Sequence, residues 1–192
     1  MLEIDHVIRF VPGRDAVDLD GFTVEPGRAH TGQGTRNVRV MFDRNYLEIL
    51  WVEYPGEVVA RGLDFLGRCT RPYTAQPFGC VLRGTMPAAL RARFVPYELP
   101  DSPGTVLQLL AEQPAAAPFL AVFETDDREA MWASRRAAAP YLIHPNGARR
   151  IVHATFTCPA PPPIDELPDL RFASGAPRLD LDLDGLRRSY TP

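Results

Sequence analysis

The sequence has little cysteine and no long apolar run, and each shortage excludes a class of protein. Its 192 residues include three cysteines, Cys69, Cys80 and Cys158, which are far apart and odd in number. They form neither a disulfide framework nor the paired spacing of a zinc site, so a reducing cytoplasm is the expected compartment. No apolar run approaches the roughly 20 residues of a membrane helix. The acidic N-terminal stretch also lacks the basic segment of a signal peptide.

Charge of one sign is not concentrated anywhere along the chain. The net charge is −3, and acidic and basic residues are mixed along the chain without a cluster of basic residues. This argues against nucleic acid or a membrane surface as partner. Hydrophobic residues make up 45% of the sequence, enough to bury a globular core. The 20 prolines favour many short strands and turns over long helices. A small molecule is therefore the expected ligand.

Strand patterns dominate the sequence. Side chains alternate over residues 2–11, which places an apolar set on one face of a half-buried strand: Leu2, Ile4, His6, Ile8 and Phe10. By alternation and composition, further strands are expected over residues 21–25, 36–42, 46–53, 78–83, 94–99, 105–111, 119–125 and 150–157. Short helices are expected over 57–67, 86–93 and 127–138, and a closing hairpin over 170–183 with its turn at 174–177.

A weak internal repeat indicates two related halves. The segment Asp5–Arg9 resembles Gly79–Arg83, and the distance along the chain from His6 to Glu48 nearly equals that from Cys80 to Ala121. Each half then reads as strand–helix–strand–strand–strand. We expect one module at about 1–56, a second at about 77–125, a linking helix and strand at 126–157, and a proline-rich spacer with the closing hairpin at 158–192.

Two polar residues interrupt apolar strand faces. His6 lies among aliphatic neighbours, and Glu48 interrupts the strongest strand signal in the chain. Buried imidazole and carboxylate groups need partners, because leaving them unpaired in an apolar environment is costly. The simpler alternatives are a core histidine bonded to a backbone carbonyl and a glutamate that reaches solvent at a strand edge.

Two loops carry further histidines. His30 precedes the Gly32-x-Gly34 loop, whose flexible backbone is suited to approach an anion, although a plain tight loop explains it equally well. His144 precedes Pro145-Asn146-Gly147, which is first of all a turn signal.

Several of these segments resemble the glyoxalase-like domain of the vicinal oxygen chelate superfamily. They are residues 2–8, 21–37, 46–50 and 144–148, whereas residues 78–125 match by strand order only. The resemblance implies an α+β fold in which two βαβββ modules form a curved, cup-like mixed sheet, here with a C-terminal β extension. Metal ligands then come from the first and last strand of each module, which places them at His6 and Glu48. The corresponding positions of the second module are Cys80 and Ala121, or Glu124 if the register slips, and these depart from the four-ligand pattern.

The resemblance implies a divalent-metal-dependent lyase or isomerase that stabilises an enolate of a small oxygenated substrate. The ion would be Zn, Ni, Fe(II) or Mn, and Glu48, His30 and His144 are the candidate catalytic groups. Either His30 or His144 would close a two-histidine, one-carboxylate set, as in an iron dioxygenase. The alternatives are a metal-free protein that sequesters a small molecule in the same cup, and a cup with a structural role only. A monomer and a homodimer are equally compatible with the sequence.

Overall fold

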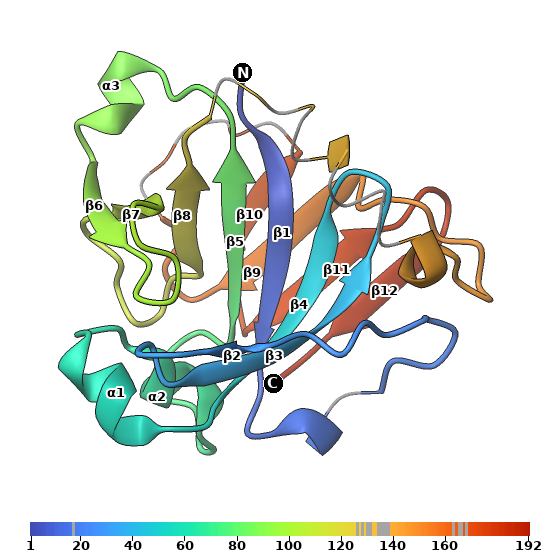
Figure 1. Ribbon diagram of the computed structural model, residues 1–192, viewed down its shortest axis with the longest axis horizontal. Coiled ribbons are helices and arrows are strands. Elements are labelled where there is room, and N and C mark those ends of the chain that lie inside the picture. The colour runs from blue at the N-terminus through green and yellow to red at the C-terminus, as the bar shows by residue number, and fades with distance from the viewer. Residues whose placement is uncertain are drawn as a thin grey trace.

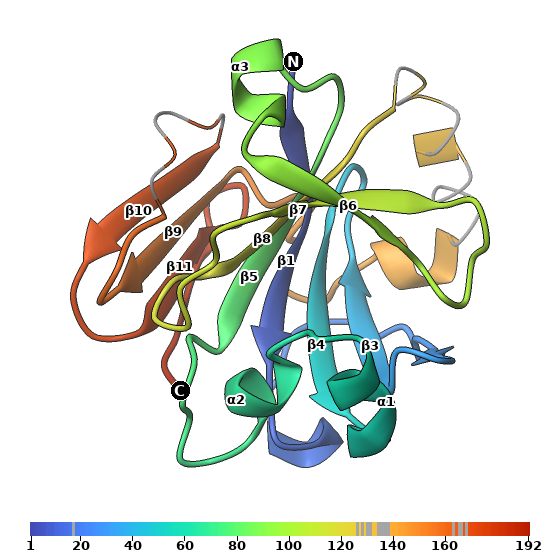
Figure 2. The same ribbon diagram turned by 90° about the vertical axis from the view of Figure 1, so that its left-hand side faces the viewer.

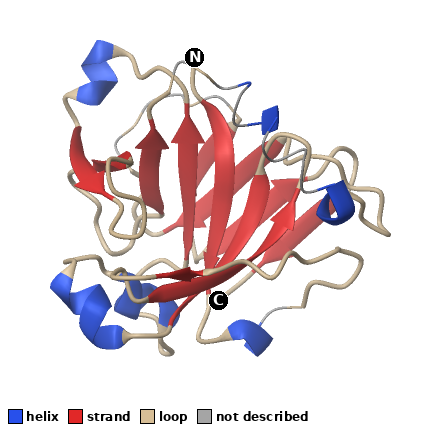
Figure 3. Cartoon of the chain, viewed as in Figure 1, coloured by secondary structure: helices blue, strands red, loops and turns tan. Residues whose placement is uncertain are grey.

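The structure is a computed structural model that describes residues 1–16, 18–125, 127, 129, 132–133, 139–162, 164, 167 and 169–192. Strands form its centre, and the helices lie at the periphery (Figure 3). This is the α+β class that the resemblance implies, and its many strands are those that the alternation predicts. The helix expected over 127–138 lies largely outside the described residues.

The larger sheet of the described chain has eight strands in the order β2-β3-β4-β1-β5-β8-β7-β6. Their bounds are β1 (Glu3–Phe10), β2 (Ala29–His30), β3 (Thr35–Met41), β4 (Tyr46–Val52), β5 (Phe78–Arg83), β6 (Phe94–Glu98), β7 (Val106–Leu110) and β8 (Phe119–Phe123). At the centre, β1 and β5 pair antiparallel, while β1 is parallel to β4 and β5 is parallel to β8. Each half therefore repeats the same strand order outward from the centre, as the weak internal repeat predicts.

A second sheet covers one face of the first. It consists of β10 (Leu170–Ser174), β9 (His153–Cys158), β11 (Arg178–Asp182) and β12 (Arg187–Tyr190), in that order. These strands lie behind β1, β4 and β5 in Figure 1. The expected hairpin around 174–177 is wrong, because β9 lies between β10 and β11 and pairs with both. The closing hairpin is formed instead by β11 and β12.

The helices of the described chain are single turns or little more. They are α1 (Pro55–Ala60), α2 (Phe65–Cys69), α3 (Ala88–Arg91) and the 3₁₀ turns Arg14–Ala16 and Ala139–Leu142. The one helix expected over 57–67 is thus two short helices. The strand expected over 21–25 is reduced to a bridge between Glu25 and Arg39. Among the described residues, no helix has the length and apolar character needed to cross a membrane.

The two faces of the larger sheet have different surroundings. One face packs on the second sheet through aliphatic side chains such as Val38, Val40 and Ile49. The other face is concave, and its apolar cluster includes Ile8, Phe65 and residues of β5 and β8. In the view of Figure 2, β6 and β7 cross in front of the central strands, with α1 and α2 below them. This concave face holds the candidate site.

Candidate functional site

A β-bulge at Asp5 sets the orientation of the first strand. Ile4 pairs with Leu82 of β5, but the next register pair is His6 with Val81, so Asp5 is the extra residue. A bulge reverses the alternation of side chains beyond it. Ile4 therefore faces the core between the sheets, whereas Asp5 and His6 both line the concave face. The predicted apolar face of residues 2–10 is thus split between two sides of the sheet.

Asp5 links two side chains of this face. The Nδ1–H of His6 donates to Asp5 Oδ1 at 2.6 Å. The guanidinium of Arg83, on β5, forms an ion pair with the other oxygen of the same carboxylate. Both members of this pair are buried, with only 2% and 3% of their side chains exposed. A buried carboxylate held in this way fixes the ring orientation of His6, because the bond to Nδ1 leaves Nε2 pointing away from Asp5.

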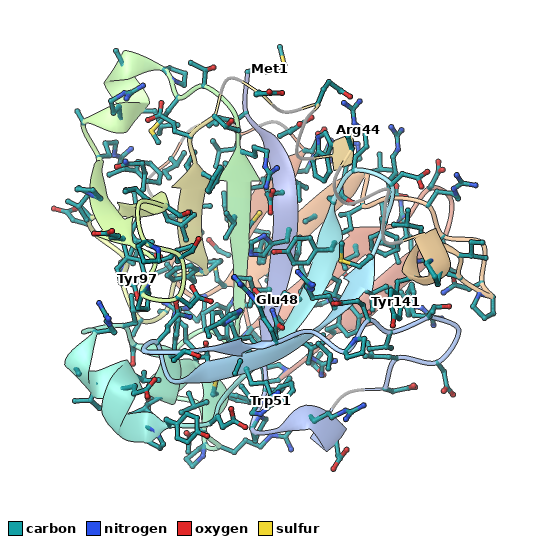
Figure 4. All side chains as sticks on the ribbon, viewed as in Figure 1. Met1, Arg44, Glu48, Trp51, Tyr97 and Tyr141 are labelled. Atoms are coloured by element: carbon teal, nitrogen blue, oxygen red, sulfur yellow. The ribbon has the colours of Figure 1, made fainter. Side chains whose placement is uncertain are left out.

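The Nε2 atom of His6 faces Glu48 of the neighbouring strand. Nε2 lies 3.4 Å from Glu48 Oε2. The ring of Tyr46, which pairs with His6 in register, stacks on the imidazole at 4.4 Å with an interplanar angle of 15°. The two polar residues that interrupt apolar strands therefore meet in one site. In Figure 4 the label of Glu48 marks the middle of the concave sheet.

Glu48 is buried but well supported. Asn37 Nδ2 donates to Glu48 Oε1 at 2.5 Å, and His30 Nε2 lies 4.0 Å from the same oxygen. Burial raises the pKa of Glu48, but the hydrogen bond and charge of His6, together with smaller contributions from His30 and the Asn37 hydrogen bond, outweigh it and lower the pKa to about 2. The carboxylate is therefore ionised at neutral pH and is a ligand or hydrogen-bond acceptor rather than an acid.

In contrast to the ionised Glu48, His30 is uncharged. Its Nδ1 is 2.8 Å from Thr35 Oγ1, and its Nε2 is 3.3 Å from Asn37 Nδ2. An amide nitrogen can only donate, so Nε2 is the acceptor and Nδ1 carries the proton. Burial lowers the pKa of His30, and the attraction of Glu48 only partly opposes this. His30 is thus a neutral imidazole whose unprotonated Nε2 faces Asn37 and Glu48.

These residues form one end of a cavity of about 270 Å³. Its polar lining includes Arg28, Gln33, Arg39 and the residues described above. Arg39 is paired with Glu25 at 2.6 Å, and Arg28 with Asp101 at 3.2 Å. The remaining wall is apolar and aromatic, formed by Ile8, Leu50, Leu63, Phe65, Val81, Leu99, Leu107, Leu109, Phe119 and Phe123. A cavity with one polar end and one apolar wall suits a small amphipathic molecule.

The second module offers no ligands at the corresponding positions. His6 pairs with Val81, not Cys80, and Val81 in turn pairs with Ala121. Both are apolar members of the concave cluster. Cys80 faces the opposite way, into the core between the sheets, and burial raises the pKa of its thiol. Glu124 accepts a hydrogen bond from the backbone N–H of Met86 and contacts Arg91.

His144 is held elsewhere. Its Nδ1 accepts the backbone N–H of Thr23 at 3.1 Å, and its Nε2–H donates to the carbonyl of Met41 at 2.8 Å. The ring packs edge-on against Phe22 and Phe42. Both nitrogens therefore serve the backbone, which is the arrangement of a structural histidine. The structure does not bring His144 to the cavity with His6, His30 and Glu48.

The distances between the side-chain donors of His6, His30 and Glu48 decide whether they could bind a metal ion together. Among the described residues, no group of three or more His, Cys, Asp or Glu side chains is arranged as a metal cluster. The 3.4 Å between His6 Nε2 and Glu48 Oε2 is close to the roughly 3.3 Å that separates two ligands at about 2.0–2.1 Å from a tetrahedral ion. The Asp5 carboxylate behind His6 is the common second partner of a metal-binding imidazole. His6 and Glu48 thus fit an ion with open positions, and His30 completes a set of three if its ring moves closer.

Sequence patterns indicate His6, His30 and Glu48 but miss the groups that support them. Asp5 was expected on the opposite face, because alternation carries no sign of a bulge. Arg83 ends a predicted strand, and nothing in the pattern indicates that it pairs with Asp5. Asn37 lies on the strand face opposite Val38, and from that face its amide reaches Glu48.

Comparisons with known proteins agree with this architecture. A family model described as a glyoxalase-like domain matches residues 4–167. The crystal structure of a hypothetical protein from Staphylococcus aureus is similar with a TM-score of 0.54 and 18% identity, over 82% of this chain and 70% of that one. At this identity the likeness shows the fold alone. No curated protein matches the chain.

Proposed function

Because the chain belongs to the glyoxalase-like domain family, we propose that it is a divalent-metal-dependent enzyme of the vicinal oxygen chelate superfamily. Its reaction is of the lyase or isomerase type and acts on a small molecule with neighbouring oxygens. The observation that carries the proposal is the meeting of His6 and Glu48 at ligand spacing, with Asp5 behind His6, in the wall of one cavity.

The donor set decides which ions are suitable. One imidazole nitrogen, from His6, and one carboxylate oxygen, from Glu48, suit hard or borderline divalent ions such as Zn, Ni, Fe(II) or Mn. When bound, such an ion would supply Lewis-acid polarisation of the substrate oxygens, the chemistry by which an enolate is stabilised.

The side chains of this site have separate tasks in the proposal. Asp5 holds the ring of His6 through Nδ1. His30 is the proton acceptor, because burial keeps its imidazole neutral and Nε2 is its unprotonated nitrogen, held only by a 3.3 Å contact from the amide of Asn37. The apolar wall formed by Phe65, Phe119 and Phe123 excludes water from the reacting centre.

The test is elemental analysis of untagged protein after mild dialysis. We expect close to one divalent ion per chain in the wild type, and its loss in His6→Ala. The matched control is His153→Ala, which removes an exposed histidine on β9 and should keep the ion. Turnover of 2-oxoaldehydes by the metal-loaded protein, lost in His30→Asn, would support the catalytic part. A wild type that retains no metal, even after reloading with zinc, nickel or iron(II), contradicts the metalloenzyme.

One observation favours a second candidate, a metal-free cup that sequesters a small molecule. The second pair of ligand positions was expected at Cys80 and Ala121, but Cys80 faces the core, and Val81 and Ala121 stand on the concave face instead, so this half of the site is apolar. A sequestering protein would bind its ligand equally well after treatment with a chelator. Ligand affinity measured before and after chelation therefore separates the two functions.

A further inference from the structure

The polar and apolar residues that line the cavity come from different strands of the sheet. On the side of β2, β3 and β4, the lining includes the polar side chains of His30, Arg39 and Glu48. On the side of β5, β8 and β7, every lining side chain except Arg83 is apolar. β1, which carries His6, lies between these two groups of strands (Figure 1). The change from polar to apolar lining therefore occurs at β1.

Register pairs trace one row of side chains from His6 into the apolar half. His6 pairs with Val81 of β5, which pairs in turn with Ala121 of β8. Ala121 then pairs with Leu109 of β7. Register partners on neighbouring strands project to the same face of a sheet. Val81 is therefore the first apolar neighbour of His6 on the concave face, and the side chains of β7 are reached only three strands away from β1.

Some apolar side chains beside this row line the cavity but are only partly buried. They are Leu107 of β7, Phe123 of β8 and Leu63, which follows α1. Leu107 is two residues from Leu109 on the same strand, so both side chains project to the concave face. Apolar surface that stays in contact with water is unfavourable, and a ligand that covers it with its own apolar group gains free energy.

The polar side chains of this half are already paired or buried. Arg83 is only 2% exposed and forms its ion pair with Asp5. Asp101, which follows β6, pairs with Arg28 at 3.2 Å, and its Oδ2 is buried. The hydroxyl of Tyr97 is buried as well. A polar or charged ligand group placed over β5, β8 and β7 would therefore lose its contacts with water without gaining a partner.

We propose that a tail-binding surface, formed by Val81, Leu107, Leu109, Phe119 and Phe123, holds an apolar substituent of the substrate. This inference rests on the proposed function, in which the neighbouring oxygens of the substrate lie at His6 and Glu48. The substrate class is then a small molecule whose neighbouring oxygens carry a hydrocarbon side chain, in place of a sugar-like or charged group.

The size of the cavity limits the length of that side chain. The cavity of about 270 Å³ has the volume of about nine water molecules, which allows roughly ten non-hydrogen atoms in the whole substrate. Val81, beside His6, should contact the first carbons of the side chain. Leu107, on β7, should contact only the last carbons of a long one. The order of the strands thus predicts an effect of each residue that depends on chain length.

The experiment uses straight-chain 2-hydroxy acids of about three to about eight carbons, which stay close to that size. Their dissociation constants are measured by calorimetry on the intact protein loaded with zinc. We expect each added CH₂ group to lower Kd roughly threefold to fourfold until the cavity is filled. The longest acid with a hydroxyl on its last carbon should bind roughly tenfold more weakly than the plain acid.

Leu107→Ala tests the order of side chains along the tail-binding surface. It should weaken the binding of the longest acid at least about fivefold and leave the shortest acid unchanged. Leu107→Met conserves the side-chain volume and should restore the behaviour of the wild type. The control is Val95→Ala, which shortens an exposed side chain of β6 and should leave the affinity for every acid unchanged.

A Kd that does not depend on chain length overturns the tail-binding surface, and so does a wild type that binds no acid of the series. Equal weakening of the shortest and longest acids by Leu107→Ala, or tighter binding of the hydroxylated acid, overturns it as well. Failure of the proposed function shows separately, as the absence of a divalent ion in the elemental analysis. The series is then measured on the metal-free protein, where the same change per CH₂ group supports the surface and a flat series refutes it.

Discussion

The ion pair between Asp5 and Arg83 should be the most costly single contact to break in the site. Both side chains are almost fully buried, so Asp5→Asn leaves a guanidinium in the interior without its counter-charge. Removing one partner of a buried pair typically costs about 3–5 kcal/mol. Arg83 also lies over the rings of Phe123 and Trp132, which offsets part of the loss. We therefore expect the free energy of unfolding to fall by about 3 kcal/mol.

Urea unfolding followed by circular dichroism, with linear extrapolation to water, measures this change. The control is Asp43→Asn, whose partner Arg149 is 65% exposed, and which should cost less than about 1 kcal/mol. The double variant Asp5→Leu with Arg83→Met should recover most of the loss, because neither charge of the pair is left buried without its partner. The reasoning is refuted if Asp5→Asn costs no more than Asp43→Asn, or if the double variant is as unstable as the single one.

Three further predictions concern single groups. Because the folded pKa of Glu48, about 2, is below its ordinary value of 4.5, Glu48 stabilises the fold above pH 4.5 and loses this effect as the pH falls towards 2; acid unfolding of Glu48→Gln should show a shallower decline there. His144→Ala should lower the free energy of unfolding by about 2 kcal/mol without changing metal content, and a loss of metal would return His144 to the site. Burial raises the pKa of Cys69 to about 12 and also raises that of Cys80, so a disulfide reagent should label neither thiol before unfolding, and rapid labelling of the native protein would contradict this.

The pattern of apolar and polar residues along the chain was sufficient to predict most strands of the larger sheet. Residues 46–52 alternate between the two faces, so Leu47 and Ile49 face the core while Tyr46, Glu48 and Leu50 face the cavity. The same rule correctly placed β3 and β5–β8 within one or two residues of their ends. It succeeded because each strand has one face in an apolar core, which imposes a period of two on the sequence.

The errors come from features that depend on distant partners. A bulge at Asp5 inserts one residue into β1, and no residue type announces it. The internal repeat aligned His6 with Cys80, although pairing across the bulge sets His6 against Val81. In the second sheet, the turn residues after Ser174 were read as a hairpin, but β9 lies between the two strands. Turn chemistry shows where a strand ends and not which strand it pairs with.

The near-symmetry of the larger sheet contrasts with the asymmetry of its chemistry. Both halves place the same four strands in the same order, and both present the faces of their first and last strands to one cavity. His6, His30 and Glu48 all come from the first half, whereas the second half contributes Val81 and Ala121 at the matching places. Its polar contribution includes Arg83 of β5, which forms the ion pair with Asp5 behind His6. Under the proposed function, substitutions of His6, His30 and Glu48 should therefore alter the chemistry, whereas substitutions of Val81 and Ala121 should alter the shape of the apolar wall.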